Sequence, residues 1–321
     1  MLFLKIILLS IISSNGILYN ETYFGYNDFD ISNTMTLNLN NSLNKYLGYI
    51  NYTNYQEPDY HTIEHLSKDI IHNNLHLSND LNRGIDYRNI NNINYVTSVK
   101  YQHTCGACVS FAAIAVLEIQ YKLKGYTLDL SEKDLFFCKG LRNCDIGWYL
   151  YDVSIVLKHK EISEEKYCPY FEYSYMCSDS CHIYSLYAID EFYYINNFNE
   201  MKHWLDRNGT LLTRMNVYRD FFDYNSGIYE KNSDNYIGGH AVAVIGYNDK
   251  HSYWICKNSW GRQWGEEGFF RIKYGEAGIM PYAYGYKIHS VPDPYVVNYS
   301  PSKYIHIMLY ILILFLQIFY I

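Results

Sequence analysis

The sequence predicts an α+β fold of two lobes, a helical lobe followed by one built around an antiparallel sheet. Residues 109–124 form a long run that is apolar on nearly every face, which is typical of a helix buried in a core. Beyond residue 208 the pattern changes to short runs rich in β-branched and aromatic residues, separated by turns. Helices in the first half and strands in the second are typical of an α+β domain.

Three helices are expected in the first half of this domain. The first covers 109–124 and ends at Gly125, a residue suited to a helix C-terminus. The second starts at Ser131, where Asp134 completes a weak capping pattern, and the third covers 148–158. In the second half we expect a helix at 201–208 and strands at 209–217, 241–247, 253–257 and 268–273.

Cys108 and His240 each lie at the start of a predicted element, one in each lobe. Cys108 opens the first helix, at the positive end of its dipole, and His240 opens a predicted strand. We therefore expect the two residues to meet in a cleft between the lobes, which is a common place for a substrate site.

Composition limits the kinds of partner. The chain has 321 residues, of which 49% are hydrophobic and 18% charged, and its net charge is −7. This is sufficient for a domain of roughly 200 residues with flanking segments, and it lacks the basic footprint of a nucleic-acid-binding protein. The 12 histidines are scattered, and the cysteines form one Cys-x-x-Cys pair. The sequence therefore predicts neither a metal site nor a cofactor.

The N-terminal segments differ from the domain, which we place at 83–292. Residues 1–16 are typical of a secretory signal peptide, with a positive charge, an apolar run and small residues near a cleavage site. Residues 17–82 are rich in Asn, Tyr, Asp and Thr and lack cysteine, which fits a removable pro-segment or a flexible spacer; we favour the pro-segment. Asn-x-Ser/Thr sequons fit the same secretory route and lie at Asn20, Asn40, Asn51, Asn208 and Asn298.

A linker at 293–303 leads to an apolar C-terminal tail at 304–321. As a helix this tail would span about 27 Å, slightly less than the ~30 Å hydrocarbon core of a bilayer. Three interpretations stay open: a lipid-anchor signal that is removed, a retained tail helix, and an apolar terminus with no membrane role. We expect membrane attachment in some form, on the luminal or extracellular side.

Four side chains predict cysteine-nucleophile chemistry. Gln102 precedes Cys108, and His240 and Asn258 follow it by 132 and 150 residues. The thiolate is the reactive form of cysteine, and an imidazolium together with a helix N-terminus stabilises it. In chain order the set offers an oxyanion donor, a nucleophile, a base and an orienting group, which predicts acyl transfer.

The motifs around these residues resemble the papain-like cysteine proteases, the family of papain and the cathepsins. The segments 105–108 (CGAC), 239–242 (GHAV) and 257–268 (KNSWGRQWGEEG) carry the resemblance, which covers about 84–287. It implies the papain-like two-lobed fold. It also implies that Cys108 is the nucleophile, His240 the general base and later acid, and Asn258 the residue that orients the imidazole. Gln102 and the Cys108 backbone N–H would stabilise the oxyanion.

Two further site residues are implied by the resemblance. Trp260 is similar to the indole that shields the His–Asn pair from water, and Gly147 to a glycine whose backbone pairs with extended substrate. Two positions depart from the family pattern: Val109 replaces an aromatic residue, and Ile146 replaces a glycine. We expect these changes to tune activity and substrate preference rather than to abolish activity.

The resemblance also implies disulfides. Cys105–Cys144 and Cys138–Cys177 match family positions, and Cys168 and Cys181 remain as an extra pair. Cys256, on a predicted buried strand, would then be a reduced core thiol.

We therefore expect a cysteine endopeptidase that is made as a precursor and hydrolyses protein or peptide substrates through an acyl-enzyme thioester. Endopeptidase activity is preferred because no histidine-bearing insertion of the exopeptidase kind is found. The expected location is secreted, lysosomal or vacuolar, or membrane-anchored. Two alternatives stay open: a redox pair or simple disulfide of Cys105 and Cys108, and a catalytically impaired papain-like binding or surface protein.

Overall fold

The computed structural model describes residues 83–171, 177, 180–183 and 185–289, all of which belong to the unit Leu39–Ile321. The predicted signal peptide (1–16), pro-segment (17–82), linker (293–303) and tail (304–321) lie outside the described residues. Of the expected domain 83–292, the structure describes all but the last three residues and short stretches between 172 and 184.

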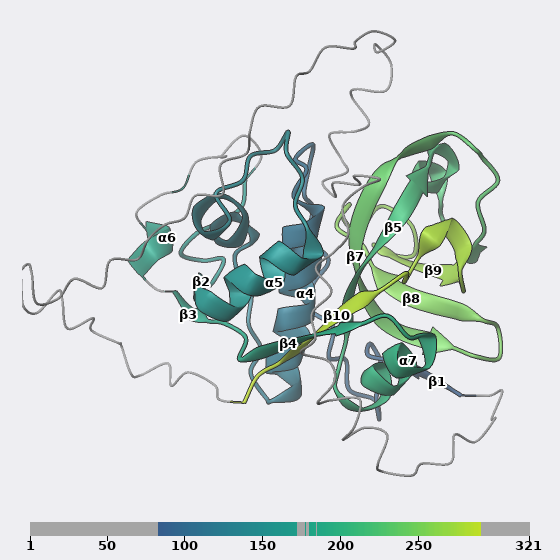
Figure 1. Ribbon diagram of the computed structural model, residues 1–321, viewed down its shortest axis with the longest axis horizontal. Coiled ribbons are helices and arrows are strands. Elements are labelled where there is room, and N and C mark those ends of the chain that lie inside the picture. Colours follow the sequence, from purple (N-terminus) through teal and green to yellow (C-terminus); the bar gives the residue numbers. More distant parts are fainter. Residues whose placement is uncertain (1–82, 172–176, 178–179, 184, 290–321) are drawn as a thin grey trace, which may run out of the picture. The chain divides into compact units, whose positions relative to one another are not determined.

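Helices dominate the first half of the described chain, as the sequence predicts. The α-helices are α4 (Cys108–Leu123), α5 (Leu150–His159), α6 (Ser180–Ile183) and α7 (Phe198–Arg207), with a π-helix at Asp134–Lys139 and 3₁₀ turns at Arg219–Asp223 and Glu276–Gly278. In Figure 1, α4 and α5 lie beside the β-rich part of this unit.

The strands form one large sheet and one small sheet. Their bounds are β1 (Gly84–Asp86), β2 (Ile162–Ser163), β3 (Ser185–Tyr187), β4 (Glu191–Ile195), β5 (Leu211–Tyr218), β6 (Ile228–Tyr229), β7 (Tyr236–Asn248), β8 (Tyr253–Lys257), β9 (Phe269–Lys273) and β10 (Ala283–Lys287). The large sheet has the order β4-β10-β5-β7-β8-β9-β6, with β1 paired to β7, and β2 pairs with β3. Every pair is antiparallel except β6 with β9.

Helix α4 is the centre of the core. Every residue from Cys108 to Tyr121 is buried, and the helix packs against β7, β5 and β10. Its C-terminus is closed by two backbone hydrogen bonds, from the N–H of Gly125 to Lys122 and from the N–H of Tyr126 to Tyr121. Gly125 has a φ of +93°, a conformation that glycine adopts easily, so the predicted helix end is confirmed.

Strand β7 is the central strand on which α4 rests. It is buried along almost its whole length, because β5 and β8 flank it within the sheet and α4 packs against it. Such a strand is expected to be apolar on both faces, and the run from Ala241 to Ile245 is.

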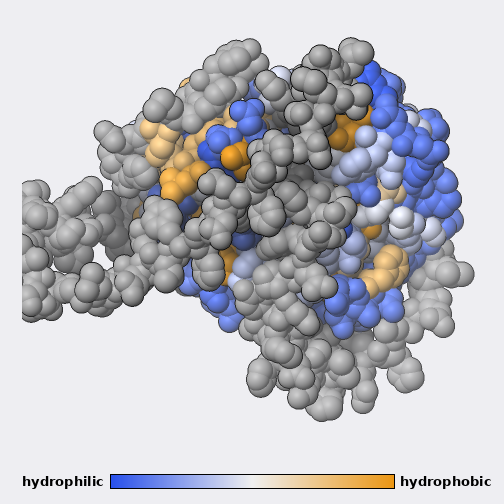
Figure 2. Space-filling view, turned by 45° about the horizontal axis from the view of Figure 1, so that its top comes forward, coloured by the Kyte–Doolittle hydropathy of each residue, from blue (hydrophilic) through white to orange (hydrophobic). Residues whose placement is uncertain are grey.

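Figure 2 shows that hydrophilic side chains gather at the right of the drawn face, on the side where Figure 1 places β5, β7, β8 and β9.

One predicted detail of the fold is wrong. His240 does not open a strand but lies inside β7, because Gly238 and Gly239 continue the strand and pair with Val217 and Asn216 of β5. The predicted helix start at Ser131 is confirmed, because the Ser131 hydroxyl accepts the N–H of Asp134 at 2.9 Å; from Asp134 onward this helix is wound as a π-helix. Strands β1, β2, β3, β4, β6 and β10 were not predicted.

Within the described residues, no helix is both long enough and apolar enough to cross a bilayer. The expected membrane-attached tail lies outside this range.

Truncating a side chain in the middle of α4 should destabilise the protein strongly. Leu117 is fully buried, so Leu117→Ala should lower the free energy of unfolding by about 2–5 kcal/mol, measured by urea denaturation. The matched control is Leu141→Ala at a side chain that is 80% exposed, where the change should stay within about 0.5 kcal/mol. Equal effects of the two substitutions would contradict the central role of α4.

Candidate active site

Cys108 is the first residue of α4, as predicted, and it lies against the strand that carries His240. Its Sγ accepts a hydrogen bond from the backbone N–H of Ala241 at 3.3 Å. The residue before the helix, Ala107, provides no side-chain cap, and the first turn holds no acidic residue. The positive end of the helix dipole is therefore available to a negative charge on the sulfur.

His240 and Asn258 come from neighbouring strands. Ala243 of β7 pairs with Lys257 of β8, so the antiparallel register brings the residues before Ala243 beside those after Lys257. His240 Nε2 and Asn258 Oδ1 are 2.8 Å apart, and both residues are buried. The predicted pair of imidazole and carboxamide is thus brought together.

The Asn258 carboxamide determines which nitrogen of His240 carries a hydrogen. Its Oδ1 also accepts the backbone N–H of Ser259 at 2.8 Å, which identifies this atom as the carbonyl oxygen. Because a carbonyl oxygen only accepts, Nε2 of His240 must donate, and the neutral ring then presents Nδ1 as an acceptor. Among the described residues Nδ1 has no hydrogen-bond partner, so this nitrogen is the one suited to take a proton.

Burial controls the charge of the imidazole. It lowers the pKa of His240 to about 4, although the hydrogen bond to Asn258 acts in the opposite direction. At neutral pH the ring is therefore neutral unless a negative charge lies beside it. A thiolate on Cys108 would be such a charge.

Gln102 is joined to the segment that follows Asn258. Its backbone N–H donates to the carbonyl of Ser259 at 2.9 Å, and the Ser259 hydroxyl donates to its Oε1. Its Nε2 donates to the carbonyl of Cys105 at 2.8 Å. The side-chain nitrogen is therefore held beside the loop that leads to Cys108. Sequence reasoning gave Ser259 no role, although it lies inside the 257–268 motif.

Trp260 covers the imidazole. Its ring centroid lies 4.9 Å from that of His240, and it stacks parallel to Phe222 at 5.1 Å. Phe221 and Trp264 extend this aromatic wall, with centroids 5.5 and 5.0 Å from Trp260. The wall lies against one face of the His240 ring, where the resemblance implied a shielding indole.

The positions that depart from the family pattern lie close to the start of α4. Val109 is fully buried in the core, and Ile146 is 49% exposed. Gly147 is half-buried, three residues after Cys144, whose carbonyl accepts the N–H of Gly106 at 3.0 Å. This link brings the segment with Ile146 and Gly147 next to the loop before Cys108.

The described residues contain three disulfides: the two pairs implied by the resemblance and the expected extra pair. They are Cys105–Cys144, Cys138–Cys177 and Cys168–Cys181. Cys108 is not disulfide-bonded, and the partner of Cys105 is Cys144, so the alternative of a disulfide between Cys105 and Cys108 is wrong for this structure. Cys256 is a buried thiol on β8, as predicted, and burial raises its pKa.

A buried ionic network lies behind the site, and sequence reasoning gave it no chemistry. Lys100 Nζ is 2.9 Å from Glu132 and 3.5 Å from Glu118, and Lys257 Nζ donates to Thr97 at 3.0 Å. Burial raises the pKa of Glu132 and lowers that of Lys257, so both groups are biased toward their uncharged forms. The network ties together the two segments that carry Gln102 and Asn258.

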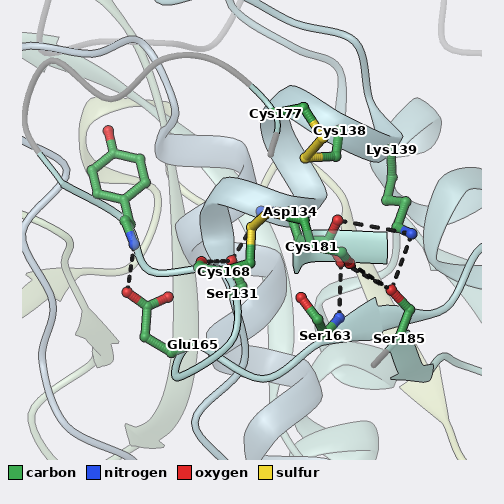
Figure 3. The surroundings of a disulfide bond; sticks show 11 residues. Ser131, Asp134, Cys138, Lys139, Ser163, Glu165, Cys168, Cys177, Cys181 and Ser185 are labelled. Atoms are coloured by element: carbon green, nitrogen blue, oxygen red, sulfur yellow. Dashed lines mark hydrogen bonds and ion pairs between the residues drawn. A yellow bond between two sulfur atoms is a disulfide. The ribbon is translucent and has the colours of Figure 1, made fainter. Parts of the chain in front are cut away.

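One group of metal-ligating residue types lies close together in the part of the chain that the structure describes. The ligand atoms of Asp134, Cys138, Cys168 and Cys181 are all within 4.8 Å of one another (Figure 3). Cysteine binds metals as the thiolate, and here all three sulfurs are in disulfides. We therefore assign no metal to this group while its cysteines are disulfide-bonded.

Residues 81–286 match the model of the papain family cysteine proteases, and this match covers more than half of the chain. The chain belongs to the papain family.

Two solved structures share its fold. Digestive procathepsin L 3 of Tenebrio molitor has a TM-score of 0.56 and 26% identity, with 67% of this chain and 72% of that chain covered. Bromelain of Ananas comosus, solved with the E64 inhibitor, has a TM-score of 0.55 and 29% identity, with 64% and 99% covered.

Curated relatives belong to plants, viruses and animals. Fruit bromelain of Ananas comosus is 32% identical, with 60% of this chain and 55% of the relative covered. A viral cathepsin of Cydia pomonella granulosis virus is 34% identical, with 56% and 54% covered. Cathepsin J of Mus musculus is 33% identical, with 61% and 63% covered. The chain thus spans about half the length of the first two of these relatives.

The lowered pKa of His240 should appear in the pH dependence of stability. In a Cys108→Ala chain, an unfolded His240 takes up a proton as the pH falls below 6.5, whereas the folded one stays neutral to about 4. His240 therefore contributes stability that is present above pH 6.5 and is lost as the pH falls towards 4, by about 3 kcal/mol in all.

The control is the double variant Cys108→Ala/His240→Gln, measured by urea denaturation across the same pH range. Other titrating groups contribute equally to both curves, so their difference isolates His240. Parallel curves would contradict the lowered pKa.

Proposed function

We propose that this chain is a cysteine endopeptidase that hydrolyses internal peptide bonds of protein or peptide substrates. The observation that carries the proposal is the contact between Cys108 Sγ and the backbone N–H of Ala241, next to an imidazole whose Nε2 is bonded to Asn258. The chain's membership of a cysteine protease family supports it.

In the first step, the Cys108 thiol gives its proton to Nδ1 of His240. Separate charges would be unfavourable at this buried site, as the lowered pKa of His240 shows, but the thiolate and the imidazolium form together and attract each other. The start of α4 lowers the cost of the negative charge further. Asn258 keeps Nε2 protonated, which leaves Nδ1 as the acceptor.

The thiolate then attacks the substrate carbonyl, and negative charge develops on the carbonyl oxygen. The Gln102 amide and the Cys108 backbone N–H donate to this oxygen. Gln102 needs no rearrangement, because Ser259 and the Cys105 carbonyl already hold its amide. A donor that is fixed in advance stabilises the developing charge more effectively than a mobile one.

His240 next gives its proton to the leaving amine, and the acyl group remains on Cys108 as a thioester. Water, activated by the same Nδ1, hydrolyses the thioester and regenerates the thiol. Trp260 limits access of bulk water to the Asn258 side of the ring. Extended substrate would pair with the backbone at Gly147, and the exposed Ile146 would restrict the side chains that fit beside it.

The chain is proposed to be a precursor that enters the secretory pathway, with a signal peptide at 1–16 and a pro-segment at 17–82. Three disulfides in the described residues support this route, because such bonds persist in oxidising compartments. Attachment to a membrane through residues 304–321 is part of the same proposal.

An epoxide of the E64 type should label Cys108, and the same protein should cleave an internally quenched peptide that is blocked at both ends. Both activities should disappear in Cys108→Ala because the nucleophile is lost. The measurements are mass spectrometry of the labelled peptide and fluorescence, on the full chain and on a form shortened at its N-terminus by limited proteolysis. Cys256 serves as the internal control and should stay unlabelled, because it is a buried thiol with a raised pKa.

Labelling without cleavage would favour the impaired binding-protein alternative. Absence of both activities in both forms would overturn the proposal.

Replacing Gln102 by glutamate should lower kcat by about 10²–10³-fold, because a carboxylate cannot donate to the oxyanion. Alkylation of Cys108 by iodoacetamide forms no oxyanion, so its rate should change much less. The matched control is Gln120→Glu. Gln120 is also a buried glutamine, but it lies near the C-terminal end of α4, away from Cys108, and donates to the carbonyl of Asn208. A similar loss of kcat in both variants would show that Gln102 has a structural role instead.

A further inference from the structure

Two disulfides lie side by side within the helical lobe, where the π-helix carries Cys138 and α6 carries Cys181, and together they form a sulfur cluster that the proposed mechanism does not use. The sulfur atoms of Cys138, Cys168 and Cys181 are within 4.8 Å of one another, although Cys138 is bonded to Cys177 (Figure 3). Three sulfurs from two disulfides at this distance allow thiol–disulfide exchange between the bonds once one of them opens.

Exposure differs sharply across the cluster. Cys168 and Cys181 are fully buried and Cys138 is 8% exposed, whereas Cys177 is exposed. A thiol in solution therefore reaches the Cys138–Cys177 bond from the Cys177 side, and Cys138 is the leaving group. This direction places the released sulfur inside the cluster rather than in solvent.

We propose that Cys177 is a modification site for a small monothiol such as glutathione, and that Cys138 relays the exchange to the Cys168–Cys181 bond. The product carries glutathione on Cys177, a new disulfide from Cys138 to one of the other two cysteines, and a thiol on the third.

The exchange is balanced at each step. The incoming thiolate forms a bond to the Cys177 sulfur while the Cys177–Cys138 bond breaks, and the electron pair leaves on Cys138. The Cys138 thiolate then attacks the Cys168–Cys181 bond, and the displaced sulfur takes a proton from water. One thiol is consumed and one is formed, so no net oxidant or reductant is required.

Charged groups beside the cluster affect the second step. The buried carboxylate of Asp134 accepts the N–H of Ser163 at 2.8 Å and lies 3.8 Å from Lys139 Nζ (Figure 3). A carboxylate oxygen of Asp134 lies within 4.8 Å of the sulfurs of Cys138, Cys168 and Cys181. A carboxylate at this distance disfavours a neighbouring thiolate, so it slows the relay without preventing it.

The cluster is connected to the candidate active site through Tyr170, two residues after Cys168. The Tyr170 hydroxyl donates to the backbone carbonyl of Gln102 at 2.9 Å, and its ring contacts Phe111 of α4 edge-on, with centroids 4.9 Å apart. Its N–H donates to Glu165 at 2.6 Å. A new partner for Cys168 or Cys181 therefore changes the restraint on the segment that supports Gln102. This consequence rests on the proposed function, whereas the exchange itself does not.

The exchange is tested in the full Cys108→Ala chain, which removes the reactive thiol of the candidate site. The chain is treated with glutathione, quenched with acid, denatured, alkylated and mapped by mass spectrometry. We expect glutathione on Cys177 and the new alkylated thiol on Cys168 or Cys181. Cys256, already a thiol in the structure, is alkylated in every sample and serves as the standard. A new thiol that remains on Cys138, or glutathione mainly on Cys105 or Cys144, overturns the proposal.

Two variants give the controls. In Cys168→Ser/Cys181→Ser the relay has no target, so the new thiol must stay on Cys138. If this variant does not fold, Asp134→Asn gives an independent test. Removing the charge should favour the Cys138 thiolate. A roughly tenfold greater thiolate fraction, offset in part by lower nucleophilicity, would make the second step about threefold faster. An unchanged rate would overturn the placement of Cys138 beside Asp134 during exchange.

The link to Gln102 is tested separately with the wild-type chain. Peptide hydrolysis should fall in proportion to the fraction of exchanged chain. It should recover after free glutathione is removed by gel filtration, because the displaced thiol then re-forms the Cys168–Cys181 bond and Cys138 displaces glutathione from Cys177. Exchange that is mapped as expected but leaves kcat unchanged overturns the link through Tyr170.

Discussion

The contact between the first turn of α4 and strand β7 is the constraint on which the rest of the structure depends. Helix α4 is buried along fourteen consecutive residues, from Cys108 to Tyr121, and β7 is the central strand of the large sheet. Neither element can shift without opening the core, so Cys108 Sγ is held against the backbone beside His240. Apolar packing thus fixes the position of Cys108 relative to His240, the two residues between which we propose that a proton moves.

In the described part of the chain, the site contains buried polar atoms without hydrogen-bond partners, as do other parts of the core such as Trp148 and Trp204. Within the described residues, His240 Nδ1, Asn258 Nδ2 and Trp260 Nε1 are buried and lack hydrogen-bond partners. An unpartnered buried polar atom lowers the stability of the folded protein by about 1–3 kcal/mol, so these three atoms together destabilise it. In the buried network, by contrast, Lys100 Nζ lies 2.9 Å from Glu132 and 3.5 Å from Glu118, so this cation has partners within the protein.

The sequence was sufficient to predict the central helix, the order of lobes and the residue types of the site. A buried helix has a distinctive apolar run, and the spacing of Cys108, His240 and Asn258 is specific. It was not sufficient for features that arise from distant contacts. Strand β4 pairs with β10 almost a hundred residues later, and the tautomer of His240 depends on a backbone N–H at Ser259. The position of His240 inside β7 was missed because glycines at 238 and 239 are typical of a turn, whereas here they pair with β5.

The position of His240 inside a strand has a consequence for how this scaffold can change. His240 lies opposite Met215 of β5, in a strand that β8 joins from Ala243 onward, whereas Ile146 and Gly147 lie in an irregular segment before α5. Insertions and substitutions in irregular segments are tolerated far better than those in a central strand. Recognition can therefore diversify, by evolution or by loop grafting, while the reacting atoms keep their geometry.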